Sequence, residues 1–161
     1  MWSIQQIAGC FQTYQKKLKI DGLSDQHYIY IQKICKFPGI IQDDLAALLY
    51  IDKSSVTRQI AQLETAGYVI RKPDERDRRF RHIYPTEKAK KILPAIKQMR
   101  RQWNEQLTED ISDADWEALT RILDTLTFKA IELSGQPESV EDIDRKLCPV
   151  ERIRPKNEGV C

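Results

Sequence analysis

Residues 41–86, IQDDLAALLYIDKSSVTRQIAQLETAGYVIRKPDERDRRFRHIYPT, change their apolar period once, at Gly67. Before Gly67 the apolar residues recur every three or four positions, as they do along one face of a helix. The pattern predicts two short helices, at about residues 42–50 and 53–66, with a tight turn between them. Gly67 then stands directly after the second helix, where a left-handed residue is favoured.

After Gly67 the pattern becomes that of β-strands. Residues 68–72 and 80–84 are rich in β-branched and aromatic side chains, and the polar segment 73–79 separates them. We expect a β-hairpin with a charged tip. Helix, turn, helix and hairpin in this order predict a winged helix-turn-helix, so the expected fold class is mainly α with a small β-hairpin wing.

The second helix has one apolar and one polar face. At 100° per residue, Val56, Ile60 and Leu63 point toward the first helix, and small hydroxyl side chains with one arginine point away from it. Small side chains let a helix enter the major groove, and arginine can donate two hydrogen bonds to guanine. The alternative is a face that meets only water, which is usual for an isolated helix but is normally rich in Lys and Glu. We predict DNA contacts from Lys53, Ser54, Ser55, Thr57, Arg58 and Gln62.

The tip of the hairpin alternates acidic residues with arginines. Because carboxylates repel phosphate, this pattern is not that of a purely electrostatic clamp. We expect an aspartate to hold one arginine in place while another enters a narrow minor groove, where negative potential is concentrated. A solvated turn with internal ion pairs, each contributing about 0–1 kcal/mol, is the alternative. The predicted wing contacts are Arg76, Asp77, Arg78 and Arg79.

Two segments resemble the MarR family, the multiple-antibiotic-resistance regulators. Residues 54–69, SSVTRQIAQLETAGYV, preceded by Leu45-Ala46, look like the helix-turn-helix of that family. Residues 74–79, DERDRR, followed by Thr86, look like its wing and the start of its next helix. The resemblance covers about residues 23–90.

The resemblance implies a winged-helix lobe on a dimerisation domain made from the first and last helices of both chains. It also implies that Arg79 enters the minor groove with Asp77 as its partner. Two residues depart from the family pattern: Pro85 stands where Leu is usual, and Ala89 stands where Gly is common.

Helices are also expected on both sides of this central segment. The apolar spacing predicts one helix over about residues 2–20 and a second helix whose N-cap is Ser24 or Asp25. Beyond the hairpin, Pro85-Thr86 open a long helix that contains Pro94, and Ser112 with Asp115 looks like a capping box before the last helix. The expected domains are an N-terminal dimerisation helix (1–22), a winged helix-turn-helix DNA-binding lobe (23–86), C-terminal dimerisation helices (87–134) and a tail of uncertain order (135–161).

The two helices after the wing carry long apolar stripes. Their apolar surface is more than a small lobe can cover, and a second copy is the simplest cover, since two-fold dimers are the commonest oligomers. A homodimer would place two recognition helices about 34–36 Å apart, which predicts an inverted-repeat operator in double-stranded DNA. The stripes consist of Ile92, Ile96, Met99, Trp103 and Leu107, and of Trp116, Leu119, Ile122, Leu123 and Leu126.

The regulation that the resemblance implies is release of a repressor by a small aromatic effector. Tyr14, Tyr28, Tyr30 and Trp103 are candidates to line an effector site between the dimer helices and the lobe, although core is favoured at each single position. The alternative is a cysteine-based redox sensor on the same scaffold that uses Cys10. A buried, inert Cys10 is the favoured role.

The other residues that could carry chemistry do not form an enzyme site. His27 and His82 are the only histidines, and neither a glycine-rich phosphate loop nor an HExxH motif is present. We therefore expect no catalysis, no cofactor and no metal. His27 is expected at the surface or in an interface, and His82 against phosphate or water. Cys35 is expected in the core, and Cys148 and Cys161 in the exposed tail without an assigned role.

The net charge and the hydropathy pattern limit which other classes of protein are possible. The net charge is only +2, so DNA binding must come from the placement of the basic residues rather than from their excess. Neither a signal peptide nor an apolar run of roughly 18 residues is visible, so we expect a cytoplasmic protein without a membrane partner. A winged helix used as a protein-interaction module is the remaining alternative.

Overall fold

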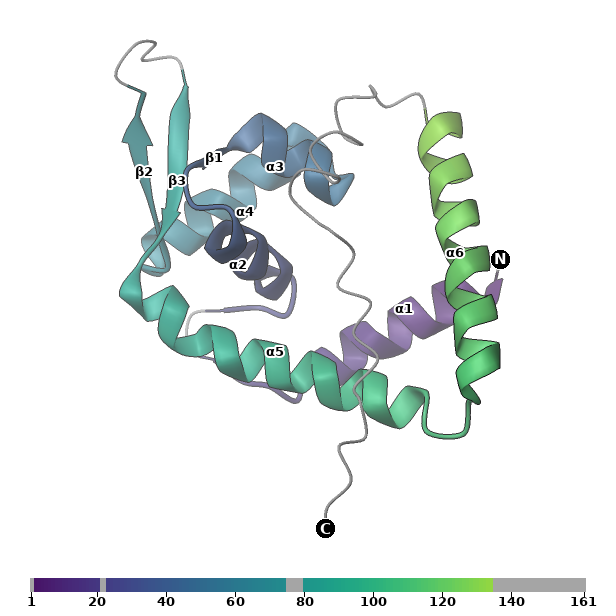
Figure 1. Ribbon diagram of the computed structural model, residues 1–161. Coiled ribbons are helices and arrows are strands. Elements are labelled where there is room, and N and C mark those ends of the chain that lie inside the picture. Colours follow the sequence, from purple (N-terminus) through teal and green to yellow (C-terminus); the bar gives the residue numbers. More distant parts are fainter. Residues whose placement is uncertain (1, 21–22, 75–79, 135–161) are drawn as a thin grey trace. The chain divides into compact units, whose positions relative to one another are not determined.

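The computed structural model describes residues 2–20, 23–74 and 80–134 (Figure 1). The chain divides into two compact units, residues 1–103 and 104–161. The fold class predicted from the sequence, mainly α with a small β-hairpin wing, is confirmed. The elements are α1 (Trp2–Gln15), α2 (His27–Lys36), β1 (Ile40–Ile41), α3 (Gln42–Leu49), α4 (Lys53–Thr65), β2 (Val69–Pro73), β3 (Arg81–Pro85), α5 (Glu87–Leu107) and α6 (Asp113–Leu133).

A small antiparallel sheet forms the base of the wing, with β3 between β1 and β2. Strands β2 and β3 are the predicted hairpin, and their register pairs Val69 with Pro85. Strand β1, which pairs Ile40 with Ile83, was not predicted, because two residues are too few to show an alternating pattern. Helix α3 follows β1 without a connecting loop, so the sheet ties the wing to the helix-turn-helix.

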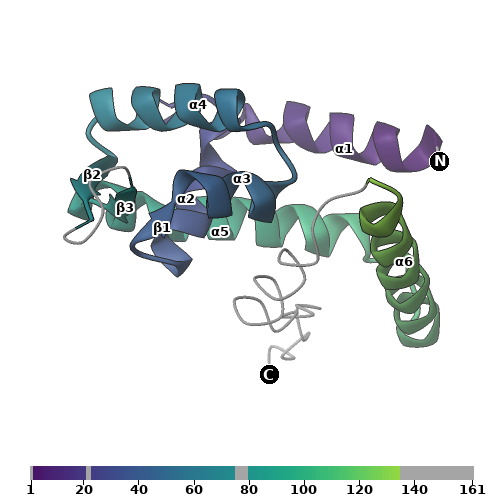
Figure 2. The same cartoon turned by 90° about the horizontal axis from the view of Figure 1, so that it is seen from above.

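Helix α4 is buried on the face that its sequence predicts. Val56, Ile60 and Leu63 are fully buried, and burial of each such side chain contributes about 1.5–3 kcal/mol. Helices α2 and α3 pack against α4, which lies along the outer side of this part of the lobe (Figure 2). Gly67 adopts the predicted left-handed conformation, with φ of +77°. The apolar side therefore holds α4 in place while its other side remains accessible.

The ends of α1 and α2 differ from the sequence prediction. Helix α1 ends at Gln15 rather than near Ile20, and a tighter turn follows in which the N–H of Leu18 donates to Gln15 O. The carbonyl of Leu18 then accepts a hydrogen bond from the buried Tyr28 hydroxyl, which fixes this segment outside the helix. The prediction that Ser24 or Asp25 is the N-cap of α2 is also wrong. The N-cap is Gln26, and its side chain forms no capping hydrogen bond.

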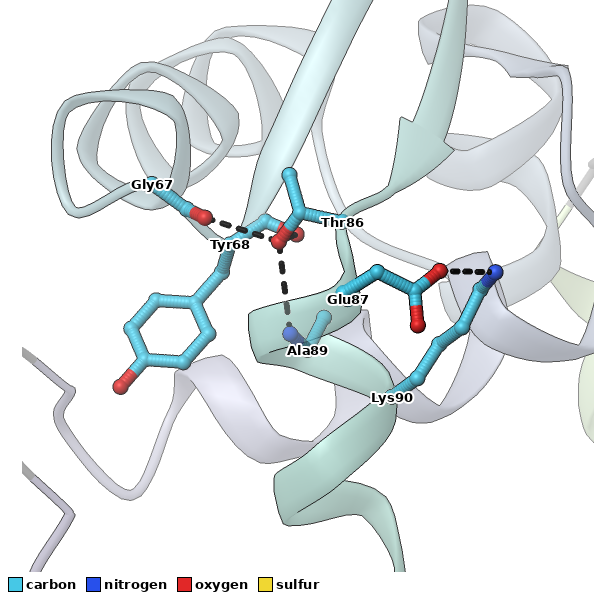
Figure 3. A network of polar contacts seen from close by, with 6 residues as sticks. All are labelled: Gly67, Tyr68, Thr86, Glu87, Ala89 and Lys90. Carbon is cyan, nitrogen blue, oxygen red and sulfur yellow. Dashed lines mark hydrogen bonds and ion pairs between the residues drawn. The ribbon is translucent and has the colours of Figure 1, made fainter.

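Thr86 joins three elements at the end of the wing (Figure 3). Its hydroxyl lies 2.8 Å from Gly67 O, at the end of α4, and 3.1 Å from Tyr68 O, just before β2. The same oxygen accepts a hydrogen bond from the N–H of Ala89 at 3.3 Å in the first turn of α5. Ala89 is fully buried, so the methyl group that departs from the family pattern is accommodated in the core.

The apolar stripes of the last two helices differ in burial: in α5 only Leu107 of the stripe is exposed, whereas most of the stripe of α6 is exposed. In α5 only Ala89, Ile96 and Met99 are buried, and no residue of α6 is. The predicted Ser112 cap is confirmed, because Ser112 Oγ accepts the N–H of Asp115 at 3.2 Å. No helix in the described ranges is long and apolar enough to cross a membrane.

Candidate nucleic-acid interface

Six residues that were predicted to contact DNA form one polar face of α4. Five of them are exposed and Ser55 is half-buried. All six lie on one helix whose opposite side is anchored in the core, so their relative positions are fixed by the helix. We refer to Lys53, Ser54, Ser55, Thr57, Arg58 and Gln62 as the polar face of α4.

Asp52 begins this helix as its N-cap. Its carboxylate accepts the Ser54 hydroxyl and, at 2.8 Å, the N–H of Ser55. These hydrogen bonds lower the pKa of Asp52 to about 2, so the group stays ionised at neutral pH. Because the helix start already uses its oxygens, the carboxylate is oriented toward its own helix rather than toward a phosphate.

Lys53 is shared between the polar face and α3. Its ammonium group lies 2.8 Å from Asp43 Oδ2, and both side chains are largely exposed. An exposed ion pair of this kind contributes little to stability, so a DNA phosphate can replace the carboxylate at small cost.

Arg58 is the one guanidinium of the polar face. It is exposed, and within the described segments it forms no ion pair with an acidic residue. Its charge also acts on the buried Tyr30. The pKa of Tyr30 is raised, by burial and then by Asp52, and Arg58 offsets only part of this increase. Its donors are therefore available to a ligand at the start of α4.

Gln62, at the other end of the polar face, is held from α2. Its Oε1 lies 3.1 Å from Nε2 of His27, which is 5% exposed. The other ring nitrogen of His27, Nδ1, accepts the N–H of Ser24 at 3.0 Å. His27 was expected at the surface or in an interface. A surface position is wrong, because the ring is buried and connects the chain before α2 to α4.

The wing is described only at its stem. Arg76, Asp77, Arg78 and Arg79 lie outside the described residues. In the stem, His82 Nε2 lies 2.8 Å from Asp74 Oδ2 and His82 Nδ1 lies 2.7 Å from Gly39 O. The carboxylate of Asp74 and then the Gly39 carbonyl raise the pKa of His82. His82 is thus bound within the protein, contrary to the expectation that it meets phosphate or water.

The candidate effector residues fall into two groups. Tyr14 and Trp103 lie side by side, with ring centroids 5.1 Å apart. Tyr28 and Tyr30 are only 2% and 3% exposed and belong to the core of the lobe. The structure therefore does not bring all four into one cluster of stacked rings.

The cysteines also differ from expectation. Cys10 was expected to be buried and is exposed on α1. Cys35 was expected in the core and is half-buried, and this burial raises the pKa of its thiol. Cys148 and Cys161 lie outside the described residues.

Sequence reasoning missed two contacts that position α4. One is the bond from His27 to Gln62, which are 35 residues apart and follow no common periodicity. The other is an ion pair in which Arg71 Nε lies 2.9 Å from Glu64 Oε2 and ties the end of α4 to β2. Only the opposite charges of Glu64 and Arg71, close in sequence across Gly67, gave a signal for the second contact.

Comparison with known proteins places the chain among regulators of transcription. The sequence model of the MarR family matches residues 21–79. The HTH-type transcriptional regulator YybA of Bacillus subtilis is 30% identical over 101 residues, which are 63% of this chain and 67% of YybA. A MarR transcriptional regulator from Methanosarcina mazei Go1 has a similar structure, with a TM-score of 0.74, 30% identity, and coverage of 81% of this chain and 95% of that one. A MarR family regulator from Listeria monocytogenes, solved in complex with 26mer DNA, has a TM-score of 0.75, 26% identity, and coverage of 84% and 94%.

Proposed function

Since this chain belongs to the MarR family of transcriptional regulators, we propose that it is a homodimeric repressor that binds an inverted-repeat operator. As a regulator of this family, it binds DNA and is not an enzyme. The observation that carries the proposal is the polar face of α4, an exposed row of hydrogen-bonding groups on a helix whose other side is fully buried. The Listeria relative solved with DNA supports the same use of this fold.

In this proposal α4 enters the major groove. Arg58 donates to the edge of a guanine, and the hydroxyl residues of the polar face allow the close approach that this contact requires. Lys53 exchanges Asp43 for a phosphate. In the wing, Arg79 enters the minor groove with Asp77 as its partner, and the flanking Arg76 and Arg78 meet the DNA backbone.

The proposed homodimer forms through residues 1–22 and 87–134, and the lobe 23–86 binds DNA. The uncovered apolar residues of α6 support this division, because a second copy would remove them from water. Two copies related by a two-fold axis present two α4 helices to successive major grooves, which is why the operator is an inverted repeat.

Regulation of this repressor is proposed to occur through a small aromatic effector. The adjacent rings of Tyr14 and Trp103 support a binding site at the contact of α1 with α5. A ligand that binds better to one spacing of the two α4 helices shifts the dimer toward that spacing and releases the operator.

Selection of bound fragments from random DNA duplexes tests the proposed function. We expect enrichment of an inverted repeat whose half-sites are one helical turn apart. A protein that enriches no sequence at low ionic strength would instead be a protein-interaction module.

A pair of substitutions tests the role of Arg58. We expect Arg58→Ala to weaken binding by about 1–3 kcal/mol and to relax base preference at one position in each half-site, because the bidentate contact is lost. Arg58→Lys is the matched control: it keeps the charge, so the salt dependence of binding should stay as in the unsubstituted protein while base preference is still lost. Equal weakening on all sequences by Arg58→Ala would show a phosphate contact instead.

A further inference from the structure

Two hydrogen bonds determine which nitrogen of His27 carries a proton. The backbone N–H of Ser24 points at Nδ1 from 3.0 Å, so Nδ1 must act as an acceptor. The Ser24 hydroxyl, 3.3 Å from the same nitrogen, is compatible with that role. The proton of the neutral ring therefore lies on Nε2, and a proton on Nδ1 would place two donors against each other.

The tautomer of His27 in turn fixes the side-chain amide of Gln62. Nε2–H of His27 donates, so the amide atom 3.1 Å away must be the oxygen Oε1. A flipped amide would set an N–H donor against an N–H donor. Gln62 is exposed, and within the described part of the chain its NH₂ group donates to no other residue.

We propose that His27 is a positioning residue that locks the Gln62 amide with its NH₂ group facing the DNA, so that Gln62 rejects cytosine at one position of each half-site. This inference rests on the proposed function, in which the polar face of α4 enters the major groove. An outward NH₂ group can only donate. On the strand that Gln62 faces, guanine, adenine and thymine each offer an acceptor in the major groove, whereas cytosine offers only its N4 donor.

The contact with His27 affects base specificity because the oxygen and the NH₂ group of a glutamine amide are similar in size and can exchange places when the amide rotates. Without His27, the amide of Gln62 can turn over and present its oxygen to cytosine N4. The side chain would then accept all four bases. Specificity at this position thus depends on a buried ring on α2 that touches no DNA itself.

The variant His27→Asn removes the contact with Gln62 and keeps the contact with the backbone of Ser24. The Asn Oδ1 takes the place of His27 Nδ1 and still accepts the Ser24 N–H, but the shorter side chain does not reach Gln62. The contacted position is first identified as the one at which Gln62→Ala loses base preference in the selected operator. Affinities of the unsubstituted protein and of His27→Asn are then measured for four duplexes that differ only in this base.

We expect the unsubstituted protein to bind the cytosine duplex about tenfold more weakly than the best duplex. His27→Asn should bind the best duplex nearly as well and should lose most of this discrimination. A general loss of affinity with unchanged discrimination would overturn the inference, as would a preference of the unsubstituted protein for cytosine. Either result would leave the proposed function intact. If no operator is selected at all, the proposed function fails and the inference fails with it.

A second measurement does not depend on a variant that must fold. In the ¹⁵N-labelled, unsubstituted protein, we expect a protonated Nε2 and an unprotonated Nδ1 for His27 in long-range proton–nitrogen spectra. Gln62→Met, which changes only an exposed side chain, should expose the Nε2 proton to faster exchange with solvent. A proton on Nδ1 of His27 would overturn the inference directly.

Discussion

At the scale of the residue, both ring nitrogens of His82 form hydrogen bonds in the stem of the wing, and these bonds depend on the protonation of the ring. Its two ring nitrogens face a carbonyl oxygen, Gly39 O, and a carboxylate oxygen, Asp74 Oδ2. Both partners accept, so both nitrogens must donate, and only the protonated ring can do this. The raised pKa of His82 has the same origin, with the Asp74 contact as its larger cause.

The protonated ring predicts a pH dependence of stability. A raised pKa in the folded protein stabilises it at pH values below 6.5, the ordinary value, and this contribution is lost as the pH rises through the raised value. The free energy of unfolding, measured with urea at several pH values, should therefore fall over this range. In His82→Gln, which cannot be protonated, that part of the pH dependence should disappear.

Asp74→Asn serves as the control for this prediction. It removes the carboxylate while leaving His82 in place, so the decrease in stability should become smaller and move to lower pH. The same pH slope in His82→Gln as in the unsubstituted protein would assign the titration to another group.

At the scale of the element, the Thr86 hydroxyl connects Gly67 and Tyr68, which lie between α4 and β2, with the first turn of α5 (Figure 3). We expect Thr86→Val, which keeps the shape but removes the hydroxyl, to lower the free energy of unfolding by about 1–2 kcal/mol. The cause is the loss of the α5 cap together with one donor to two backbone carbonyls. Chemical denaturation measures this change. Thr86→Ser keeps the oxygen and should be nearly as stable as the unsubstituted protein. A Thr86→Val protein that is as stable as the unsubstituted protein would show that the hydroxyl contributes nothing at this junction.

The helices and the hairpin could be predicted from the sequence because their signals are local. The period of Val56, Ile60 and Leu63 gave the buried side of α4, and Gly67 gave its end. Strand β1 could not be predicted, since its two residues pair only with a strand far along the chain. The same holds for the candidate interface: the exposed residues follow from helix geometry, whereas the contact of His27 with Gln62 depends on tertiary packing.

At the scale of the whole molecule, α6 is a helix that, like α1, has no buried residue in the described part of the chain. Six of its large apolar side chains are between 38% and 77% exposed, and none of its residues is buried. We expect the double substitution Ile122→Glu and Leu126→Glu to give a monomer in sedimentation experiments, because two charges would have to enter the proposed interface. The monomer should bind the operator about 10²- to 10⁴-fold more weakly, since the two half-sites are no longer held by one particle.

The control for this prediction lies on the same helix. Glu117→Lys changes the charge on the opposite face of α6 and should leave both the dimer and its DNA affinity unchanged. A double variant that still sediments as a dimer would place the interface elsewhere in the chain.

The uncovered α6 also has a consequence for how much protein a cell must make. If subunits pair only weakly at cellular concentrations, the amount of operator-binding particle rises with the square of the subunit concentration. Operator binding would then respond more steeply than linearly to gene dosage, and a twofold change in expression would alter operator occupancy by up to about fourfold. The apolar side of one helix would in this way link the synthesis rate of the regulator to its output.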